Sequence, residues 1–404
     1  MPPTSEAYLE CSSCATIYPI GPLFFGCTAC RQRGHIAALV MRYSTTRDLL
    51  RDTSRPGIWQ WRGLLPPVPE NQIVSLGEGS TPLRRVRNWE GSAELYLKNE
   101  TMNPTWSYKD RAASVSATMA RFLGFSCTTA ISTGNLGNSV AAYSSVAGLA
   151  CAIFCNPGAP ELQLALMERY GARVFRGGDQ NALVRQLITR GGWFPATVVC
   201  PRDGFANPYG VEGFKTIAFE IFEQLGDRVP DRVFAPTGSG DGLFGIWKGF
   251  YELHRLGIAK SVPKMIACQA SGADVYVRAV RSGATKLTAL PSVATVALSI
   301  AEKIGGEMTL GALYQTHGDA IAVTDEQMMT AAADLGGEGY ALEPASAASV
   351  ACARTIAAEA SAGEIWVAIG TGAAIKWPHD LTQGFVMPAA LPDEFDRIDE
   401  LMKA

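Results

Sequence analysis

Short apolar runs alternate with longer stretches of helical apolar spacing from about residue 93 onward. Apolar runs bounded by turn residues are typical of buried strands, and the stretches between them have the period and length of helices. This rhythm predicts an α/β fold built on parallel sheets. Helices are expected, for example, at residues 213–225 and 324–335. Strands are expected at residues 95–98, 127–131, 150–155, 172–175, 197–200, 232–235, 264–269, 320–323 and 365–369.

Lys109 stands in a polar segment, residues 103–111 (NPTWSYKDR), directly before a stretch rich in Ala, Val and Met. A lysine at a junction between a loop and a helix, among small hydroxyl residues, is well placed to react with a ligand. By itself the pattern also fits an ordinary solvated lysine at the start of a helix. Three further segments change the balance between these interpretations.

Two of these segments are polar turns that follow predicted strands and open predicted helices: residues 132–138 (STGNLGN) and 238–242 (GSGDG). The free N–H groups and the dipole of a helix N-terminus favour an anion, so the first turn suits a substrate carboxylate. The glycines of the second let backbone amides turn toward a phosphate. Its spacing fits neither a P-loop nor a dinucleotide fingerprint. Each turn alone also fits a plain turn with a helix cap or glycines.

Asp241 and Thr371 add two details to this pattern. A carboxylate beside a phosphate is repelled, so we expect Asp241 to point outward and cap the helix that follows. The third segment, residues 365–372, ends a buried strand with Thr371 between two glycines. Strand ends of this kind are where α/β folds place ligand contacts, although a structural threonine fits the position as well.

Together these segments resemble the threonine-synthase branch of the pyridoxal-phosphate (PLP) enzymes of fold type II. Four further motifs extend the resemblance over most of the chain: residues 75–83 (SLGEGSTPL), 95–100 (LYLKNE), 207–216 (NPYGVEGFKT) and 343–349 (EPASAAS). The resemblance implies a homodimer and two parallel-sheet, three-layer domains with PLP in the cleft between them. The larger domain would comprise residues 41–114 plus 211–404, and the smaller one residues 115–210.

The resemblance also implies roles for individual residues. Lys109 would form the internal aldimine with PLP and later shuttle protons. Asn135 would hydrogen-bond the 3-hydroxyl of the cofactor, and Thr371 would face the pyridine nitrogen and leave it largely unprotonated. The loop around the cofactor phosphate would consist of Gly238, Ser239, Gly240, Asp241 and Gly242. The substrate would contact Ser132 and Thr133 through its carboxylate, and also Trp106 and Ser107.

Two departures from the family pattern concern the substrate. Gly210 stands where the family's Asn-Pro-x-Arg stretch supplies an arginine to the substrate phosphate. Loss of such a charge-assisted contact removes about 1.5–3 kcal/mol of binding. Trp106 stands where the family usually has glycine, and we expect its indole to narrow the pocket. Arg202 is the candidate for rebuilding the anion site from a neighbouring position.

The sequence therefore predicts a PLP-dependent lyase or transferase that eliminates or replaces a group at Cβ or Cγ of a small, unphosphorylated amino acid. Two alternatives remain: a true threonine synthase, which converts O-phosphohomoserine to threonine and phosphate, and a PLP-binding regulatory protein with little turnover. Residues 293–306 resemble the family's segment near the substrate mouth. Glu343 is expected to be a structural carboxylate at a helix start rather than a catalytic base.

Four cysteines form two Cys-x-x-Cys pairs near the N-terminus: Cys11, Cys14, Cys27 and Cys30. This spacing suits tetrahedral thiolate ligation of zinc, and four thiolates leave no open position, so the metal would be structural. Two disulfides or a redox pair are the alternatives. A zinc ribbon at this end also occurs in some members of the resembled branch. Residues 1–40 are accordingly predicted to form a zinc-ribbon-like segment.

Composition and charge exclude several other classes of protein. The chain has 404 residues, of which 47% are apolar and 18% charged, so it can bury an ordinary globular core in two or three domains. The net charge of −3 provides no basic surface for nucleic acid or for a membrane. The first residues have no signal pattern, so we expect a cytoplasmic protein whose partner is a small amino-acid substrate.

Overall fold

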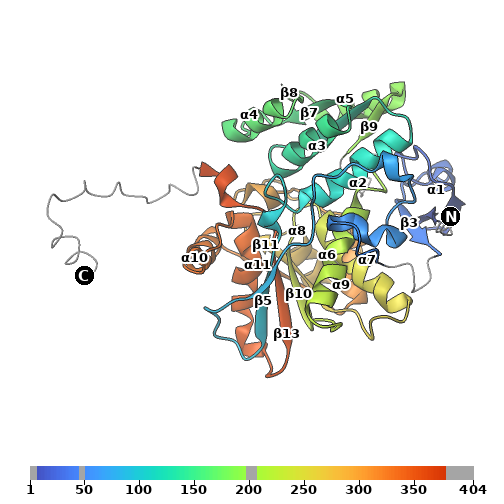
Figure 1. Cartoon of the computed structure of the whole chain (residues 1–404). Coiled ribbons are helices and arrows are strands. Elements are labelled where there is room, and N and C mark those ends of the chain that lie inside the picture. Colours follow the sequence, from blue (N-terminus) through green and yellow to red (C-terminus); the bar gives the residue numbers. More distant parts are fainter. Residues whose placement is uncertain (1–6, 45–50, 197–206, 379–404) are drawn as a thin grey trace, which may run out of the picture.

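The computed structural model describes residues 7–44, 51–196 and 207–378. Within these ranges the strands form three sheets, of six, four and three strands. Figure 1 shows the four-stranded sheet and its helices above the six-stranded sheet, with the N-terminal strands at one side. The predicted α/β architecture is confirmed.

The six-stranded sheet has the order β12-β11-β10-β13-β5-β4. All its strands are parallel except β4, which pairs antiparallel with β5. The central strands β10 and β13 are buried along most or all of their length, as expected for a parallel sheet covered on both faces. The strands are β4 (Leu83–Arg85), β5 (Glu94–Asn99), β10 (Arg232–Pro236), β11 (Lys264–Ala270), β12 (Asp319–Val323) and β13 (Ile365–Gly370).

The four-stranded sheet is parallel throughout and has the order β8-β7-β6-β9. Its strands are β6 (Cys127–Ile131), β7 (Ala150–Cys155), β8 (Arg173–Arg176) and β9 (Trp193–Pro195). The strand predicted at residues 197–200 lies outside the described residues, and the observed edge strand β9 ends just before it. Every predicted strand within the described residues is observed, while the edge strands β4 and β9 were not predicted. The predicted domain boundaries stay a prediction.

Helices cover the parallel sheets, and α2 runs between the two sheets in Figure 1. The helices predicted at residues 213–225 and 324–335 are observed as α6 and α10. The helices are α2 (Lys109–Phe122), α3 (Asn135–Val146), α4 (Glu161–Arg169), α5 (Gln180–Arg190), α6 (Val211–Gln224), α7 (Asp241–Arg255), α8 (Val275–Ser282), α9 (Glu307–Gln315), α10 (Asp325–Gly336) and α11 (Pro344–Thr355). In the described part of the chain, none of them is long and apolar enough to cross a membrane.

Residues 7–43 form a separate antiparallel sheet with one short helix, called the N-terminal unit below. The strand order is β2-β1-β3, and β3 continues to Tyr43, past the predicted end at residue 40. Leu9, Phe24 and Met41 of this unit belong to the same apolar core as the four-stranded sheet. The unit is therefore packed onto the rest of the molecule. Its elements are β1 (Ala7–Cys11), β2 (Ile17–Tyr18), α1 (Thr28–Gln32) and β3 (Leu39–Tyr43).

Candidate active site

A cavity of about 330 Å³ lies between the two parallel sheets, next to the start of α2. It is lined by residues from the lysine segment 103–111, the two polar turns 132–138 and 238–242, and the end of the segment 365–372. The predicted site residues in its wall are Lys109, Ser132, Thr133, Asn135, Gly238, Ser239, Gly240, Asp241, Gly242 and Thr371. Segments separated by more than 250 positions in the chain therefore meet at one place.

Strand ends and helix starts explain why these segments meet. The chain leaves β6, β10 and β13 at their carboxyl ends, and residues just beyond each end line the cavity. Five helices, α2, α3, α6, α7 and α11, begin at its wall. In parallel α/β sheets the carboxyl edge is where ligands bind, and helix N-termini there attract anions. The cavity is accordingly suited to a ligand with anionic groups.

Lys109 is the first residue of α2, at the predicted junction between loop and helix. Its Nζ lies 4.8 Å from the ring centroid of Tyr108 and 5.2 Å from that of Phe214. Burial by itself would lower the pKa of the Lys109 ammonium. The Tyr108 phenol and then Asp241 outweigh burial, so the pKa is raised above its ordinary value. The surroundings thus favour the charged amine in the cavity.

The loop before Lys109 is tied to the chain that follows β13. The backbone N–H of Tyr108 donates to the carbonyl of Thr371 at 2.9 Å. Ser107 and Gly372 form an isolated antiparallel bridge. These bonds hold the lysine loop and the Thr371 turn together in a fixed register.

A buried ionic network anchors α2 directly behind Lys109. Arg111 donates to Glu100 and to Glu220, in each case at 2.7 Å, and Lys98 donates to Glu220 at 2.7 Å. All four side chains are almost completely buried. Burying charges is costly unless they are paired and hydrogen-bonded, and here each is. The network fixes the helix start and so the direction of Lys109.

Trp106 and Ser107 are not part of the cavity wall. The Trp106 side chain is 39% exposed, so the prediction that its indole narrows the pocket is wrong. Its backbone has φ = 60°, a left-handed conformation that glycine adopts without strain. Backbone conformation therefore accounts for the glycine that the resembled family has here. Ser107 is buried and accepts a hydrogen bond from the N–H of Lys109 at 3.3 Å.

The glycines of the 238–242 turn are required by close packing. A Cβ at Gly240 would lie 2.3 Å from the Tyr276 hydroxyl and 2.4 Å from Thr309 Oγ1, and the φ of Gly240 is 98°. A Cβ at Gly242 would lie 2.6 Å from the Tyr108 ring. The turn therefore presents bare backbone to the cavity, where α7 begins, as a phosphate cradle requires.

Asp241 corrects one expectation about this turn. Its side chain is 6% exposed and lines the cavity, so it does not point outward. It is the first residue of α7, directly after Gly240. Ser239 Oγ donates to its carboxylate at 3.5 Å. A carboxylate at N1 is stabilised by the helix dipole, which helps to explain why it can stay at the helix start.

Ser132 is committed to capping α3. Its Oγ accepts hydrogen bonds from the N–H groups of Gly134 at 3.2 Å and Gly137 at 2.9 Å. The wall beside it contains Thr133 and the first turn of α3. The sequence left two interpretations of this turn open, a capped helix start and a ligand-binding turn. In the structure the turn caps α3 and also lines the cavity.

Asn135 and Glu343 form a pair that the sequence did not predict. Glu343 precedes α11 but makes no capping bond; its carboxylate accepts from Asn135 Nδ2 at 3.0 Å and faces the cavity. Burial raises the pKa of Glu343, and Lys376 opposes this change. Ser299 Oγ also accepts from Asn135 Nδ2, at 3.2 Å. No group within the described ranges donates to the buried Oδ1 of Asn135.

Thr371 is oriented by a residue whose role was also not predicted. The hydroxyls of Ser346 and Thr371 lie 2.9 Å apart, and Ser346 accepts from the N–H of Gly372 at 2.7 Å. Ser346 belongs to the 343–349 motif, so the resemblance covered this residue but did not predict its contact with Thr371. The expectation that residues 293–306 approach the substrate mouth agrees with the cavity, whose wall includes 298–302.

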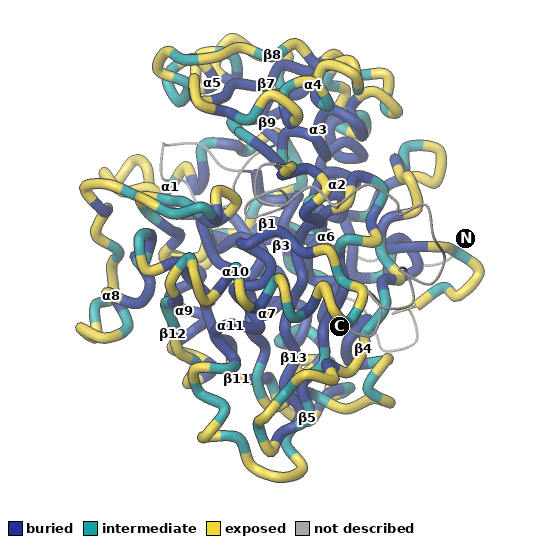
Figure 2. The backbone as a smooth tube through the Cα atoms, turned by 90° about the vertical axis from the view of Figure 1, so that its left-hand side faces the viewer, coloured by how far each residue is buried: buried dark blue, intermediate teal, exposed yellow. Residues whose placement is uncertain are grey.

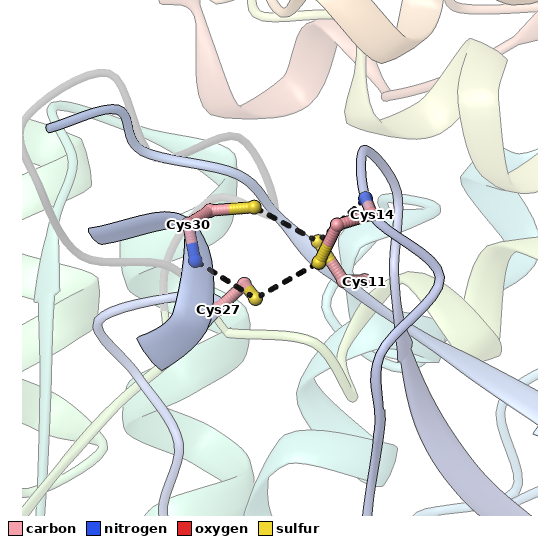
Figure 3. Close-up of side chains that lie close together, drawn as sticks. All are labelled: Cys11, Cys14, Cys27 and Cys30. Atoms are coloured by element: carbon pink, nitrogen blue, oxygen red, sulfur yellow. Dashed lines mark hydrogen bonds between the residues drawn. The ribbon is translucent and has the colours of Figure 1, made fainter. Parts of the chain in front are cut away.

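The four predicted metal ligands lie together in the N-terminal unit. Their sulfur atoms are all within 4.8 Å of one another, and the pairs Cys11–Cys30 and Cys14–Cys27 are each 3.6 Å apart (Figure 3). Four sulfurs around one zinc at about 2.3 Å would be separated by about 3.8 Å. The N–H of Cys30 donates to Cys27 Sγ at 3.4 Å, as suits a thiolate. The donor set fits tetrahedral zinc, and the thiols are not joined as disulfides.

Comparison with known proteins identifies the family. The family model described as "Pyridoxal-phosphate dependent enzyme" matches residues 74–372. The chain belongs to this family. The chain is 34% identical to the threonine synthase of Methanocaldococcus jannaschii over 98% of this chain and 99% of that protein. It is 35% identical to the threonine synthase of Methanosarcina acetivorans, over 97% of this chain and 98% of that protein.

Solved structures share the fold at lower identity. Threonine deaminase isoform 2 from Solanum lycopersicum has a TM-score of 0.63 and 21% identity, over 81% of this chain and 94% of that one. L-serine ammonia-lyase from Rhizomucor miehei has a TM-score of 0.62 and 22% identity, over 73% and 93%. The predicted PLP-dependent enzyme, with threonine synthases as relatives, is confirmed.

Two features of the cavity fit PLP itself. The unpaired Oδ1 of Asn135 can accept a hydrogen bond from a ligand hydroxyl, and PLP carries one at its ring. In the turn of residues 238–242, Gly240 and Gly242 have no room for a Cβ, so bare backbone lies at these positions, as suits a bound phosphate. The roles assigned to individual residues remain predictions.

Proposed function

We propose that the protein is a PLP-dependent lyase that eliminates or replaces a group at Cβ or Cγ of a small amino acid without a phosphate tail. The observation that carries this choice of substrate is the charge of the cavity wall. Among its described residues Lys109 is the one cation, whereas Asp241, Glu302 and Glu343 are acidic. If Lys109 also holds the cofactor, the described wall offers no second cation for the phosphate of a substrate.

The proposed roles follow from where each group lies. Lys109 would hold PLP and then move the α-proton of the substrate with its amine. When bound, PLP supplies an electron sink for the electrons left at Cα. The start of α3 with Thr133 would bind the substrate carboxylate, and residues 238–242 would bind the cofactor phosphate. Asn135 and Thr371 would orient the ring through its hydroxyl and its nitrogen.

Gly210 gives a second reason for proposing a substrate without a phosphate. It lines the cavity, and a Cβ placed there would lie 2.8 Å from Ser116 Oγ. A longer side chain at this position therefore needs its neighbour to move. Arg202, which could rebuild an anion site, lies outside the described residues.

The second candidate is the threonine synthase reaction. It is favoured by the threonine synthases to which the chain is 34% and 35% identical over nearly its whole length. Such a reaction would release inorganic phosphate from O-phosphohomoserine, so the two candidates differ in a measurable product.

The test incubates yellow, PLP-loaded protein with O-phosphohomoserine and, separately, with serine, threonine and their O-acetyl and thio analogues. We expect ammonia and a 2-oxo acid, or a replacement product when a thiol is added, from an unphosphorylated substrate. We expect no phosphate release. Rapid phosphate release with threonine as product would overturn the proposal in favour of the second candidate.

We also propose that Cys11, Cys14, Cys27 and Cys30 hold one structural zinc ion. The support is the approach of their four sulfurs to the separations that tetrahedral zinc requires. Hydrogen bonding by Thr16 lowers the pKa of the Cys14 thiol to about 6, which favours the thiolate form that binds a metal.

A further inference from the structure

The N-terminal unit contacts the wall of the cavity at two places. Gly210 and Val211, which line the cavity, stand between Tyr209 and Glu212. The Tyr209 hydroxyl donates to the carbonyl of Gly21 at 2.6 Å and accepts from its N–H at 2.9 Å. The two cavity residues therefore follow directly after a side chain bound by the N-terminal unit.

The second contact lies on the other side of the same two residues. The hydroxyl of Tyr43, at the end of β3, donates to Glu212 Oε2 at 2.8 Å. Lys215 Nζ lies 3.9 Å from the centroid of the Tyr43 ring, and Lys248 bonds both oxygens of Glu212. Figure 2 shows β1 and β3 beside α6, and this part of the tube is mostly buried.

Apolar packing joins the cysteine cluster to the first contact. Phe24, three positions before Cys27, packs against Phe194 at 5.0 Å between ring centroids, and Phe194 lies 6.5 Å from Tyr209. Tyr209 is fully buried. A metal-bound unit that recruits another protein needs a free face around its core, whereas the core of this unit is continuous with that of the four-stranded sheet. Its contacts point inward, to the cavity.

The segment held by Tyr209 also contacts the neighbouring part of the wall, on α2. Asn207 Oδ1 accepts from the N–H of Tyr209 at 2.9 Å, and Asn207 Nδ2 donates to Ser116 Oγ at 3.0 Å. Ser116 on α2 and Gly210 both line the cavity. A shift of Tyr209 would therefore move two parts of the surface that faces the substrate.

We propose that the N-terminal unit, with a metal on its four cysteines, positions the substrate wall of the cavity through the hydroxyls of Tyr209 and Tyr43. The unit is then a component of the active site. The proposal rests on the zinc site put forward above but not on the identity of the substrate. Tyr209 and Tyr43 are positioning residues, since neither touches the cavity.

The experiment compares wild type, Tyr209→Phe, Tyr43→Phe and the control Tyr8→Phe, which removes a hydroxyl from β1 of the same unit. Hydrogen exchange is followed at the amides of Glu212 and Gly213, which donate to the carbonyls of Tyr209 and Gly210. Each protein is measured with its metal and after chelation. The metal content, KM and kcat are determined on the same samples.

We expect Tyr209→Phe to keep its metal but to exchange these amides about tenfold faster and to raise KM about tenfold more than it changes kcat, since a buried hydrogen bond is worth about one decade. Chelation of the wild type should likewise speed exchange of these amides and raise KM. Chelation of Tyr209→Phe should change the exchange rate and KM by less than about a further twofold. Tyr43→Phe should act in the same direction and Tyr8→Phe should match wild type.

Unchanged exchange and KM in both Tyr209→Phe and Tyr43→Phe would overturn the proposal, as would full additivity of chelation and Tyr209→Phe. A protein that binds no metal would refute the zinc site, and the two tyrosine variants would then decide whether the unit positions the wall without metal. Exchange needs no turnover, so failure of the proposed reaction would be seen separately.

Discussion

Lys109 is positioned by neighbours on its own segment and by the turn that follows β13. The carbonyl of Thr371 fixes the loop before it, Tyr108 packs against its amine, and Arg111 anchors the helix behind it. A lysine held in one direction at the wall of a cavity loses little freedom when it reacts, which is how enzymes lower a barrier by positioning.

Replacing Lys109 tests this function directly. We expect Lys109→Ala to lower kcat by at least about a thousandfold, because a positioned proton-transfer group is worth about 10²–10⁴ and the covalent link is lost as well. Borohydride reduction of the loaded protein should no longer attach PLP to the chain, as measured by mass spectrometry. The exposed Lys260 supplies the control, and Lys260→Ala should keep both properties.

Gly210 and Ser116 together control the room for a substrate anion. We expect Gly210→Arg alone to destabilise the protein by about 1–3 kcal/mol, since its Cβ would lie 2.8 Å from Ser116 Oγ. Combined with Ser116→Ala, the same arginine should fit. It should then tighten binding of O-phosphohomoserine by about tenfold or more, as a charge-assisted contact does.

The measurement is inhibition of turnover by O-phosphohomoserine, with denaturant unfolding for stability. The uncharged pair Gly210→Leu and Ser116→Ala separates shape from charge and should show no gain. Equally tight binding by wild type would contradict our reading of Gly210.

At the scale of elements, five helix starts and three strand ends share one edge of the structure. Parallel strands place all their carboxyl ends on the same side, so turns far apart in the chain converge there. The ionic network beneath α2 ties β5, α2 and α6 to one another through Lys98, Arg111 and Glu220. The position of the cavity wall therefore depends on charges that no ligand touches.

Glu220 is the shared partner in that network. Burial would raise its pKa, but Arg111 and then Lys98 outweigh burial and hold it well below the ordinary 4.5. Its folded-state pKa is depressed, so the stabilisation is fully present above about pH 4.5 and is lost as the pH falls below it. We expect Glu220→Gln to cost about 3–5 kcal/mol near neutral pH and to flatten the loss of stability in acid.

Denaturant unfolding at pH values between 3 and 7 checks this result. The ion pair of Arg232 with the exposed carboxylate of Glu359 provides the comparison, and Glu359→Gln should change the free energy of unfolding by less than about 1 kcal/mol. If Glu220→Gln also lowered the free energy of unfolding by less than about 1 kcal/mol, the buried network would not be a major support of the fold.

At the scale of the whole molecule, all three sheets contribute to the cavity or to its support. The six-stranded sheet contributes the turns after β10 and β13, the four-stranded sheet contributes the turn after β6, and the N-terminal unit packs beside α6. Relatives that match the chain from end to end include threonine synthases.

The metal should contribute to the stability of this whole arrangement. We expect about one zinc per chain, lost in Cys30→Ala, together with a fall of several degrees in the unfolding midpoint, because a bound metal adds its binding energy to the fold. Metal analysis and thermal unfolding test this expectation. The buried Cys155 lies outside the cluster, so Cys155→Ala should keep its zinc. Loss of zinc from both variants, or from neither, would contradict the assignment of the ligands.

Local sequence patterns were sufficient to predict most strands and the segments of the site. Strand and helix periodicity placed β5 to β7, β10 to β13 and the helices between them, because burial on both faces of a parallel sheet leaves apolar runs in the chain. Turn composition marked the turns that contain Lys109, Asn135, the glycines of 238–242 and Thr371, because strand ends and helix starts have local signatures. The family resemblance implied that these turns meet at one cofactor site. The paired cysteines were found by spacing alone.

Tertiary structure decided which way side chains point and which distant groups meet. Asp241 turned out to be buried in the cavity wall, and Trp106 to lie outside it, since both depend on packing between segments that the sequence keeps far apart. The pairing of Asn135 with Glu343 spans 208 positions, and that of Gly21 with Tyr209 spans 188. Periodicity and turn chemistry act over a few residues, so contacts of this range become visible only once the chain is folded.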